Sequence, residues 1–292
     1  MSSGLDAALT PYRVLRNLVD YPLRSRLKIR RPVRSVAAAG LNGALDLLDP
    51  PDRREARRLI GHYGLEGIAA RGTRRDVLEN LFYLDLFRAA FGNGGVRLPR
   101  GRVEAVDAGV GHWFYLHALA GALRRWGTRG ERELRLLGFE ADPYRMYGDG
   151  HTRADWAAWH LQGVADALFV PEDVRRWRTT ADVAFVLFPF VFVTDADRWG
   201  LPRTMFRPLD LLSHVWRGVR PGGALVVANQ GRREADEQGR LFELAGIEPR
   251  WSARFASPFF RYREPRYVWV ALKRASAGAS TPAPSPGRGP AW

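Results

Sequence analysis

Apolar and polar residues alternate in three different ways along the chain. In residues 1–99, apolar residues recur three or four positions apart, a spacing that predicts amphipathic helices. The stretches concerned are Pro11–Val19, Val33–Leu48, Arg53–Tyr63 and Arg74–Phe91. Thr10, Asp52 and Thr73 are predicted to cap helix N-termini, and Gly92 suits a helix end. This first zone is therefore predicted to be a helical N-terminal extension.

In residues 100–274, short apolar runs alternate with helical patterns. The strand-like runs are Val103–Val106, Leu134–Phe139, Leu168–Val170, Val183–Phe188, Ala224–Ala228, Ile247–Phe255 and Arg266–Leu272. Helical stretches such as Trp113–Trp126 and Asp155–Leu161 separate most of them. This alternation predicts an α/β core with a mostly parallel sheet covered on both faces. The last two runs are joined by a short connection, so they are expected to pair antiparallel.

The third zone, residues 275–292, consists mostly of Ala, Ser, Gly and Pro. Such a composition buries too little apolar surface to offset the loss of chain entropy on folding. We therefore expect a disordered tail.

A glycine-containing turn follows the first strand of the core. Asp107 directly follows the run Val103–Val106, and Gly109 and Gly111 come before the next helical pattern. Glycines at such a turn allow a close approach between the backbone and a ligand, although the same pattern also occurs in purely structural turns. In open α/β sheets, ligands bind at the carboxyl ends of the strands. The turn is thus a candidate ligand site.

A second acidic residue stands in the corresponding place on the next strand. Glu140 directly follows the run Leu134–Phe139. A carboxylate at the tip of the second strand can accept hydrogen bonds from the ribose hydroxyls of a nucleoside. The two strand ends together favour a nucleoside-containing cofactor.

Four landmarks in this order resemble the class I S-adenosylmethionine-dependent methyltransferases. They are Asp107-Ala-Gly109-Val-Gly111, Glu140, Val219-Arg-Pro-Gly-Gly-Ala-Leu225 and Phe242-Glu-Leu-Ala-Gly-Ile247. The resemblance covers most of residues 100–274. It implies a Rossmann-like, seven-stranded, mostly parallel sheet with the last strand antiparallel, and S-adenosylmethionine as cofactor.

The resemblance also implies roles for individual residues. Asp107, Gly109, Gly111 and the adjoining Trp113 would hold the methionine end of the cofactor, and Glu140 with Ala141 the ribose. Asp173 follows the third strand and would face the adenine, with Asp166 as the alternative; either acid also suits a helix N-cap. Phe188 would line an apolar wall or belong to the ordinary core.

Three departures from the family pattern matter. Trp113 occupies the place of the usual third glycine, so the pocket near the methionine is expected to be reshaped. Leu187-Phe188-Pro189-Phe190 lacks the polar first residue with which some relatives accept a hydrogen bond from a target amine, which argues against methylation of amino nitrogens by that route. Phe114 stands where a dinucleotide fingerprint needs Gly or Ala, which argues against NAD.

Other polar residues near these strand ends remain candidates. Asn229 could bind a substrate or start a turn, and His112 and Tyr115 are conceivable acid–base groups. If the chain is a methyltransferase, the helices of residues 1–99 would form a lid over the substrate, with Asn80, Tyr83 and Phe87 as candidate lid residues. The six histidines form no HExxH pair, so no metal is predicted, although a Mg²⁺ site made of carboxylates stays open.

Composition narrows the classes of function. The chain has no cysteine, which excludes disulfides and thiolate metal sites, and it has neither a secretory signal nor an apolar run long enough to span a bilayer. A cytoplasmic protein without membrane contact is expected.

The net charge of +14 comes almost entirely from arginine, and eight basic residues lie between Tyr12 and Arg34. Such charge suits either a solvated helix face or a grip on phosphates. The preferred hypothesis is methyl transfer to a small molecule. The alternatives are an RNA-directed methyltransferase that uses this segment, and an inactive methyltransferase-like binding protein whose cofactor site is filled by Trp113.

Overall fold

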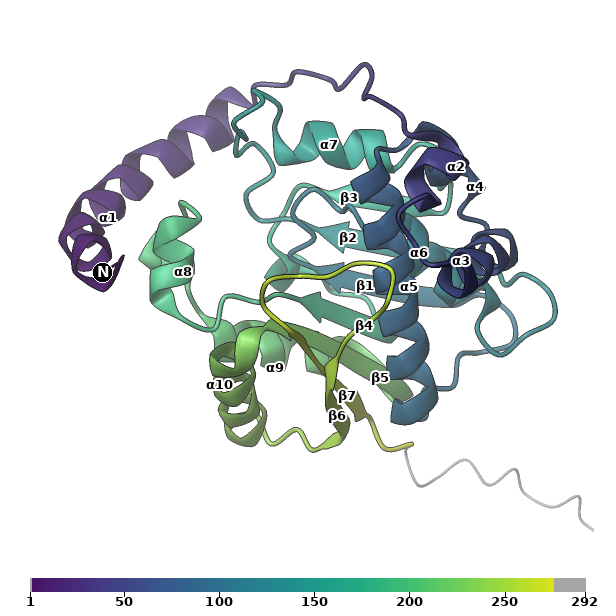
Figure 1. Cartoon of the computed structure of the whole chain (residues 1–292). Helices are drawn as coiled ribbons and strands as arrows, with labels where there is room; N and C mark the ends of the chain where they lie inside the picture. Colours follow the sequence, from purple (N-terminus) through teal and green to yellow (C-terminus); the bar gives the residue numbers. More distant parts are fainter. Residues whose placement is uncertain (1, 276–292) are drawn as a thin grey trace, which may run out of the picture.

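The strands predicted from the apolar runs form one mixed sheet in the computed structural model, which describes residues 2–275 (Figure 1). The strands are β1 (Val103–Ala108), β2 (Leu134–Phe139), β3 (Ala167–Val170), β4 (Ala181–Leu187), β5 (Val219–Gln230), β6 (Pro249–Phe255) and β7 (Arg266–Leu272). Their order is β3-β2-β1-β4-β5-β7-β6, and β7 runs antiparallel to both of its neighbours. The Rossmann-like arrangement expected from the sequence, including the final hairpin, is confirmed.

The sheet has two covered faces with separate apolar clusters. Along β1, Val103 and Ala105 face one cluster, and Val106 and Ala108 face the other. This alternation follows from the two-residue period of a strand. Because both faces are buried, the strands read as continuous apolar runs.

One face is covered by the helices that precede β1 together with the helix that follows it. These are α2 (Gly40–Leu45), α3 (Pro50–Tyr63), α4 (Glu66–Arg71), α5 (Arg74–Gly94) and α6 (Leu116–Arg125). In α5, Gly94 lies so close to the sheet that an added Cβ would stand 2.6 Å from Val270. Residues 40–94 therefore share the core of the sheet.

The other face is covered mainly by α9 (Pro208–Gly218) and α10 (Gly231–Leu244). The helices α7 (Arg153–His160) and α8 (Val193–Arg198) and the short 3-10 turns η1 (Val174–Arg176) and η2 (Arg203–Met205) lie in the connections that follow β2, β3 and β4. These connections leave the sheet at its carboxyl edge, where β1 and β4 mark the change in strand order.

Several predicted helix ends are wrong. The first helix, α1, runs over Ser2–Leu27 straight through Pro11, so Thr10 is not its N-cap. Helix α3 begins at Pro50 behind Asp49, which leaves Asp52 in its first turn, whereas the capping box of Thr73 is confirmed. Helix α5 continues past Gly92, the predicted end, to Gly94 and is capped by Gly95 in the left-handed conformation.

The segment Val33–Leu48 is helical only over α2. The backbone N–H of Ala39, just before that helix, instead donates to the carbonyl of Gly72. A hydrogen bond to a distant segment thus takes the place of a further helical turn.

The Val219–Leu225 segment is not a turn before β5, as the family pattern suggests, but part of the strand itself. The register shifts between Ala181 and Val183, opposite Pro221-Gly222-Gly223. Gly222 has a φ of +82°, and a Cβ on Gly223 would lie 2.5 Å from the carbonyl oxygen of Asp182. The glycines therefore form an irregularity that lets β5 extend over Val219–Gln230.

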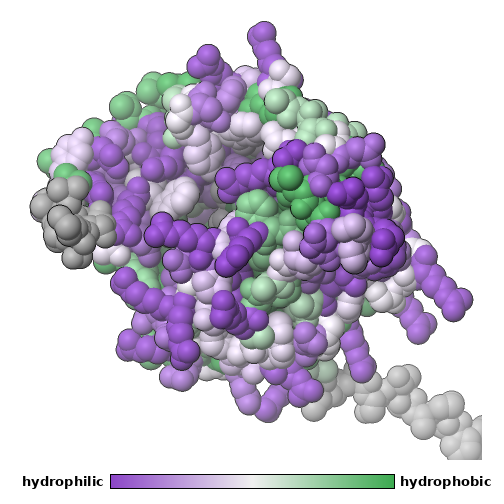
Figure 2. All heavy atoms as spheres, viewed as in Figure 1, coloured by the Kyte–Doolittle hydropathy of each residue, from purple (hydrophilic) through white to green (hydrophobic). Residues whose placement is uncertain are grey.

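Helix α1 lies at the edge of the molecule and contacts α8 (Figure 1). Leu15, Val19 and Leu23 are exposed on it, and hydrophobic residues are visible along its outer side in Figure 2. The described contacts of α1 with the rest of the chain are largely polar. Of the predicted tail, residues 275–292, only Ala275 is among the described residues.

Candidate functional site

The turn after β1 curls over the end of β2. Gly109 and Gly111 have φ angles of +75° and +59°, which suit glycine. The N–H groups of Gly109 and Val110 both donate to the carbonyl of Phe139, at 2.8 and 3.1 Å. The glycine turn is thereby fixed to the strand that carries Glu140.

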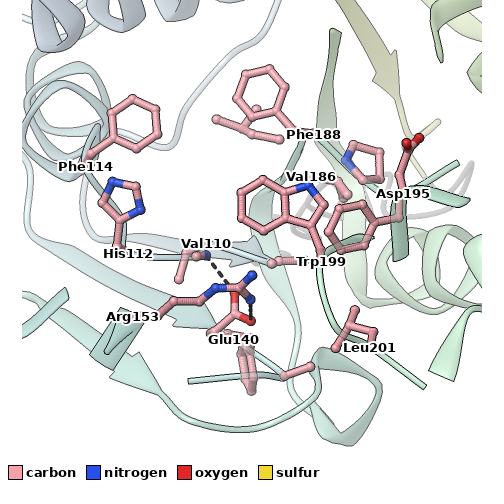
Figure 3. Close-up of a pocket in the computed structure, with 18 of the residues that line it drawn as sticks. Val110, His112, Phe114, Glu140, Arg153, Val186, Phe188, Asp195, Trp199 and Leu201 are labelled. Carbon is pink, nitrogen blue, oxygen red and sulfur yellow. Dashed lines mark hydrogen bonds and ion pairs between the residues drawn. The ribbon is translucent and has the colours of Figure 1, made fainter. Parts of the chain in front are cut away.

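Glu140 connects this turn to the loops around it. One carboxylate oxygen accepts from the Gly111 N–H at 2.7 Å; the other accepts from the Asp142 N–H at 2.8 Å and from Arg153 at 2.6 Å (Figure 3). The side chains of Glu140 and Arg153 are only 6% and 5% exposed. The two strand ends identified from the sequence are therefore in direct contact.

These residues open into a cavity of about 1020 Å³ at the carboxyl edge of the sheet. Its polar wall includes Gly109, Gly111, Glu140 and Asp173. Its aromatic wall includes Phe114, Tyr83, Phe188, Phe190, Trp199 and Tyr262. His112 and Phe114 face Phe188 and Trp199 across it (Figure 3). The cavity has the volume of a ligand pocket, with polar groups gathered at one side.

Trp113 does not lie in this cavity. Its side chain has no exposed surface, and a Cβ on Gly138 of β2 would stand 2.5 Å from its ring. The expectation that Trp113 reshapes the pocket is therefore corrected: at a φ of +56° the residue leaves the turn in the direction of the core.

Asp107 is buried beside the same indole. One of its oxygens accepts from Trp113 Nε1 and from the Tyr115 hydroxyl, both at 2.9 Å, and the other has no partner. Burial raises the pKa of Asp107 to about 7, against the effect of these two donors. Asp107 is not among the residues that line the cavity; its carboxylate instead binds the side chains of Trp113 and Tyr115.

The two acids considered for the adenine lie in different places. Asp173 lines the cavity and caps η1, where its carboxylate accepts from the N–H and the guanidinium of Arg175. Asp166 lies outside the cavity lining and pairs with Arg124 at 2.9 Å. Of these two acids, only Asp173 lines the same cavity as Glu140.

Ala141 and Phe188 both line the cavity. The carbonyl of Ala141 accepts from the Tyr21 hydroxyl at 2.9 Å. Phe188 has a φ of +59°, and its N–H donates to the carbonyl of Ala228 at 2.7 Å. This left-handed conformation ends β4.

His112 and Tyr115 line the cavity but are poorly suited to acid–base work. Burial and the nearby Arg153 lower the pKa of His112 to about 4, and its Nδ1 lies 2.9 Å from the Tyr147 hydroxyl. Burial and Asp107 raise the pKa of Tyr115 well above its usual range. His112 is therefore a weak base and Tyr115 a weak acid, so the pKa of neither residue is suited to proton transfer near neutral pH.

Three further candidates have other positions. Asn229 is fully buried and is not part of the cavity lining, and both polar atoms of its side chain lack partners. Asn80 bridges Phe114 and Ala118 in the core, and Phe87 is fully buried. Of the candidate lid residues, only Tyr83 lines the cavity.

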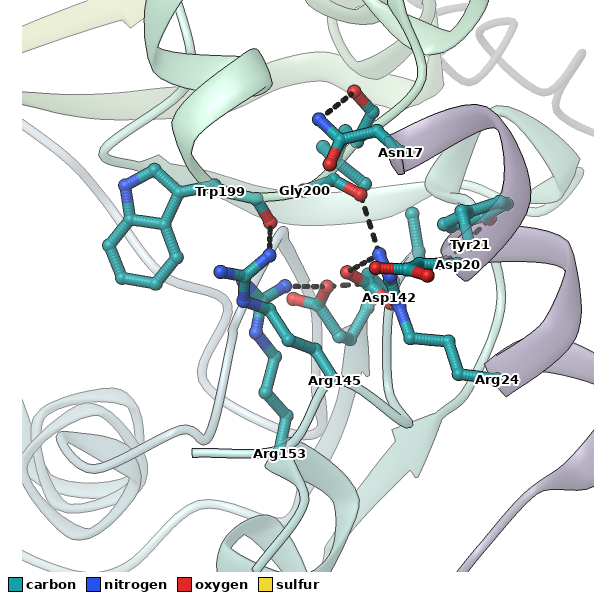
Figure 4. Close-up of polar contacts among 12 residues, drawn as sticks. Asn17, Asp20, Tyr21, Arg24, Asp142, Arg145, Arg153, Trp199 and Gly200 are labelled. Atoms are coloured by element: carbon teal, nitrogen blue, oxygen red, sulfur yellow. Dashed lines mark hydrogen bonds and ion pairs between the residues drawn. The ribbon is translucent and has the colours of Figure 1, made fainter. Parts of the chain in front are cut away.

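Helix α1 is attached beside the cavity by polar contacts (Figure 4). Arg24 binds the carboxylate of Asp142 through two hydrogen bonds of 2.7 Å and also reaches the carbonyl of Gly200. Asn17 donates to the carbonyls of Asp197 and Leu201. The helix thus ties the loop after β2 to α8 and the loop behind it.

Sequence reasoning missed Arg153, Tyr262 and Arg266, which all line the cavity. Arg153 is the first residue of α7 and directly follows the N-cap residue Thr152. The capping box formed by Thr152 and Asp155 could have indicated this helix start from the sequence. No local pattern shows that the arginine side chain turns toward Glu140. Tyr262 lies in the β6–β7 connection and Arg266 begins β7.

Within residues 2–275, no group of three or more acidic or histidine side chains is placed to hold a metal ion. None of the helices in that range is long and apolar enough to cross a membrane.

Comparison with known proteins gives likeness in structure only. No model of a protein family matches the chain, and no curated protein matches its sequence. Among solved structures, a Listeria monocytogenes protein assigned to the class I S-adenosylmethionine-dependent methyltransferases aligns with 11% identity, a TM-score of 0.47 and coverage of 95% of this chain and 90% of the other.

Two further structures align over a smaller share of the chain. A methyltransferase of this kind from Aquifex aeolicus shows 15% identity and a TM-score of 0.45, covering 66% of this chain and 90% of that one. Magnesium protoporphyrin IX methyltransferase of Synechocystis PCC 6803, with bound S-adenosylmethionine, shows 12% identity and a TM-score of 0.43. The alignment covers 68% of this chain and 81% of that one. At these identities the likeness concerns the fold alone.

Proposed function

We propose that the protein binds S-adenosylmethionine in the cavity at the carboxyl ends of β1, β2 and β4 and transfers its methyl group to a small molecule. The observation that carries this proposal is the 2.7 Å hydrogen bond between Gly111 N–H and Glu140. It joins a glycine turn to a strand-end carboxylate at the point where the strand order reverses. That is the place and the chemistry a nucleoside ligand needs in an open α/β sheet.

The cofactor, when bound, supplies a methyl group on a sulfonium that is already a good leaving group. The protein then has to align the reactants and exclude water. Glu140, with Ala141 beside it, would accept from the ribose hydroxyls, Asp173 would face the adenine, and the glycine turn would approach the methionine end. Phe188 and Trp199 provide apolar walls against water.

The rival hypotheses lose support. The inactive relative required Trp113 to fill the cofactor site, whereas its indole lies in the core. An RNA grip would use the eight basic residues near the N-terminus, two of which are engaged within the chain: Arg24 pairs with Asp142 and Arg30 with Asp155, each at 2.7 Å. A small-molecule acceptor fits the aromatic cavity better.

Calorimetric titration with S-adenosylmethionine, S-adenosylhomocysteine and NAD tests the cofactor. Binding of the first two without NAD is the expected result, and a ligand at about 100 times its Kd should also stabilise the fold by roughly 2.7 kcal/mol. Absence of binding by both sulfur compounds would contradict the proposal. Transfer itself is then checked by following labelled methyl groups from the cofactor into a panel of small acceptors.

Glu140→Gln is expected to weaken S-adenosylhomocysteine binding by roughly 10- to 100-fold, because a hydrogen bond to a charged group contributes about 1.5–3 kcal/mol. The amide keeps the shape of the side chain and one acceptor oxygen. The matched control is Glu172→Gln, an exposed acid just after β3 that lies outside the cavity lining. Unchanged affinity in Glu140→Gln and in Glu140→Ala would remove the ribose assignment.

A further inference from the structure

Arg266 is a buried cation that forms no ion pair. It is the first residue of β7, it lines the cavity, and only 6% of it is exposed. Its guanidinium donates to the carbonyl of Glu264 at 3.3 Å, and its Nε has no hydrogen-bond partner. Among the described side chains, residues 9–275, no carboxylate lies within ion-pair distance of it.

The second buried arginine of the same cavity provides the contrast. Arg153 is as deeply buried, and Glu140 neutralises it at 2.6 Å. A buried charge is costly unless it is paired. Arg266 has instead two aromatic rings, with its guanidinium carbon 3.8 Å from the Tyr262 centroid and 4.8 Å from that of Phe188. Such rings attract a cation but supply no counter-charge.

The nearby acids of the cavity wall have other partners. Glu79 accepts from Tyr262 at 2.8 Å and from Arg75 at 3.0 Å, and Glu234 accepts from the Gln230 N–H at 2.8 Å. Both carboxylates act electrostatically on this half of the cavity, Glu79 on Tyr83 and Glu234 on Arg266, and so they disfavour a ligand with two negative charges. A single negative charge fits this half of the cavity better than a phosphate dianion does.

A neutral hydrogen-bond donor lies beside the arginine. The Tyr83 hydroxyl is buried beside Tyr262 and Arg266, and no partner lies in strict hydrogen-bond geometry to it. Burial raises the pKa of Tyr83 to about 12 although Arg266 acts in the opposite direction, so the hydroxyl keeps its proton at neutral pH. The rings of Phe188 and Tyr262 lie 6.1 and 6.2 Å from that of Tyr83. These residues form a cationic pocket with aromatic walls.

We propose that Arg266 binds the carboxylate of a small aromatic or otherwise planar monoanion, with Tyr83 as a second donor and Phe188 and Tyr262 as walls. That this monoanion is the methyl acceptor rests on the function proposed above; the anion site itself does not. An arginine fork matches a carboxylate in shape as well as in charge.

The probes are benzoate, trans-cinnamate, benzamide and phenyl phosphate, whose binding to the full chain is measured by saturation-transfer NMR, with and without saturating S-adenosylhomocysteine. The two carboxylates are expected to bind at least 10-fold more tightly than the neutral benzamide. Arg266→Met should lose at least 10-fold in carboxylate affinity, and Arg266→Lys should lose less. Arg263→Met, an exposed arginine of the same connection, should leave the affinity unchanged.

The outcomes separate the two proposals. Equal binding of benzoate and benzamide by the wild-type protein, or equal benzoate binding by Arg266→Met, overturns the anion site, and a preference for phenyl phosphate overturns its monoanionic character. Should Arg266→Met not fold, the wild-type comparison and Arg266→Lys decide. Failure of S-adenosylhomocysteine to bind contradicts the proposed function, while the probes still test Arg266 in the cofactor-free protein.

Discussion

Trp113→Ala is expected to lower the free energy of unfolding by about 3–5 kcal/mol, the usual effect of removing a fully buried tryptophan. The indole is one of the largest side chains without exposed surface, and it donates to the buried carboxylate of Asp107. The loss therefore combines a cavity with a missing hydrogen bond. Urea unfolding followed by far-UV circular dichroism measures it.

Gly138 provides the matched partner for this test. Gly138→Ala alone should destabilise by roughly 1–3 kcal/mol, since its Cβ would stand 2.5 Å from the Trp113 ring. In the Trp113→Ala background the same methyl group enters the vacated space, so its effect should be neutral or favourable. A double-mutant cycle reports this coupling. Simple additivity of the two changes would show that ring and glycine do not pack together.

A milder variant separates the packing role of Trp113 from ligand contact. Trp113→Phe keeps most of the ring volume but loses the hydrogen bond to Asp107. Because the side chain lies outside the cavity lining, S-adenosylhomocysteine affinity should stay within about threefold of wild type, well under the roughly 1.4 kcal/mol of a tenfold change. A large gain in affinity would revive the hypothesis of a blocked site.

The parts of the site that could be predicted are local in the sequence. Gly109, Gly111 and Glu140 directly follow apolar strands, and parallel strands bring such ends to one edge of the sheet. The order of the landmarks was therefore enough to anticipate that turn and acid lie at the same edge of the sheet, but not that they are hydrogen-bonded. The direction of the Trp113 side chain was not predictable, because it depends on a left-handed backbone and on the space above Gly138.

The part of the cavity around Tyr83 and Arg266 could not be predicted from the sequence, for a different reason. Tyr83 comes from α5 and Arg266 from β7, and their approach depends on how α5 packs against the last hairpin. The N-terminal helix illustrates the same limit, since the family landmarks begin only at Asp107. Its polar contacts with Asp142, Gly200 and Leu201 bridge more than a hundred residues of sequence.

The second large expected effect is a loss of folding stability at low pH, caused by three histidines whose pKa is lowered by burial. His117 and His160 are almost fully buried, and His112 lies with its ring 6.0 Å from that of His160. Burial, together with Arg71, lowers the pKa of His117 to about 4, and burial, together with Arg153 and Arg75, does the same for His112. Burial takes the pKa of His160 well below 6.5. The folded protein therefore holds neutral imidazoles where the unfolded chain takes up protons below about pH 6.5.

The sign follows from proton linkage. Between pH 6.5 and about 4 the unfolded chain binds more protons on these histidines, so their contribution to stability is lost as the pH falls, by roughly 2 kcal/mol per histidine at pH 5. Asp107 acts in the opposite direction, because its folded pKa of about 7 lies above its usual 3.8 and favours the folded state as the pH falls through that range. The measured curve is thus a difference, and variants are needed to separate the two contributions.

The double variant His112→Asn/His117→Gln isolates the histidines. Between pH 7.5 and pH 5 the wild type should lose about 4 kcal/mol of unfolding free energy through these two histidines, whereas the side-chain amides of the variant do not titrate in this range. The difference in unfolding free energy between wild type and variant should therefore become smaller by about 4 kcal/mol. His62→Gln, at an exposed position, is the matched control for replacing a histidine by an amide. Conversely, Asp107→Asn should steepen the loss of stability on acidification. A parallel pH dependence in wild type and double variant would mean that these imidazoles already accept protons in the folded protein.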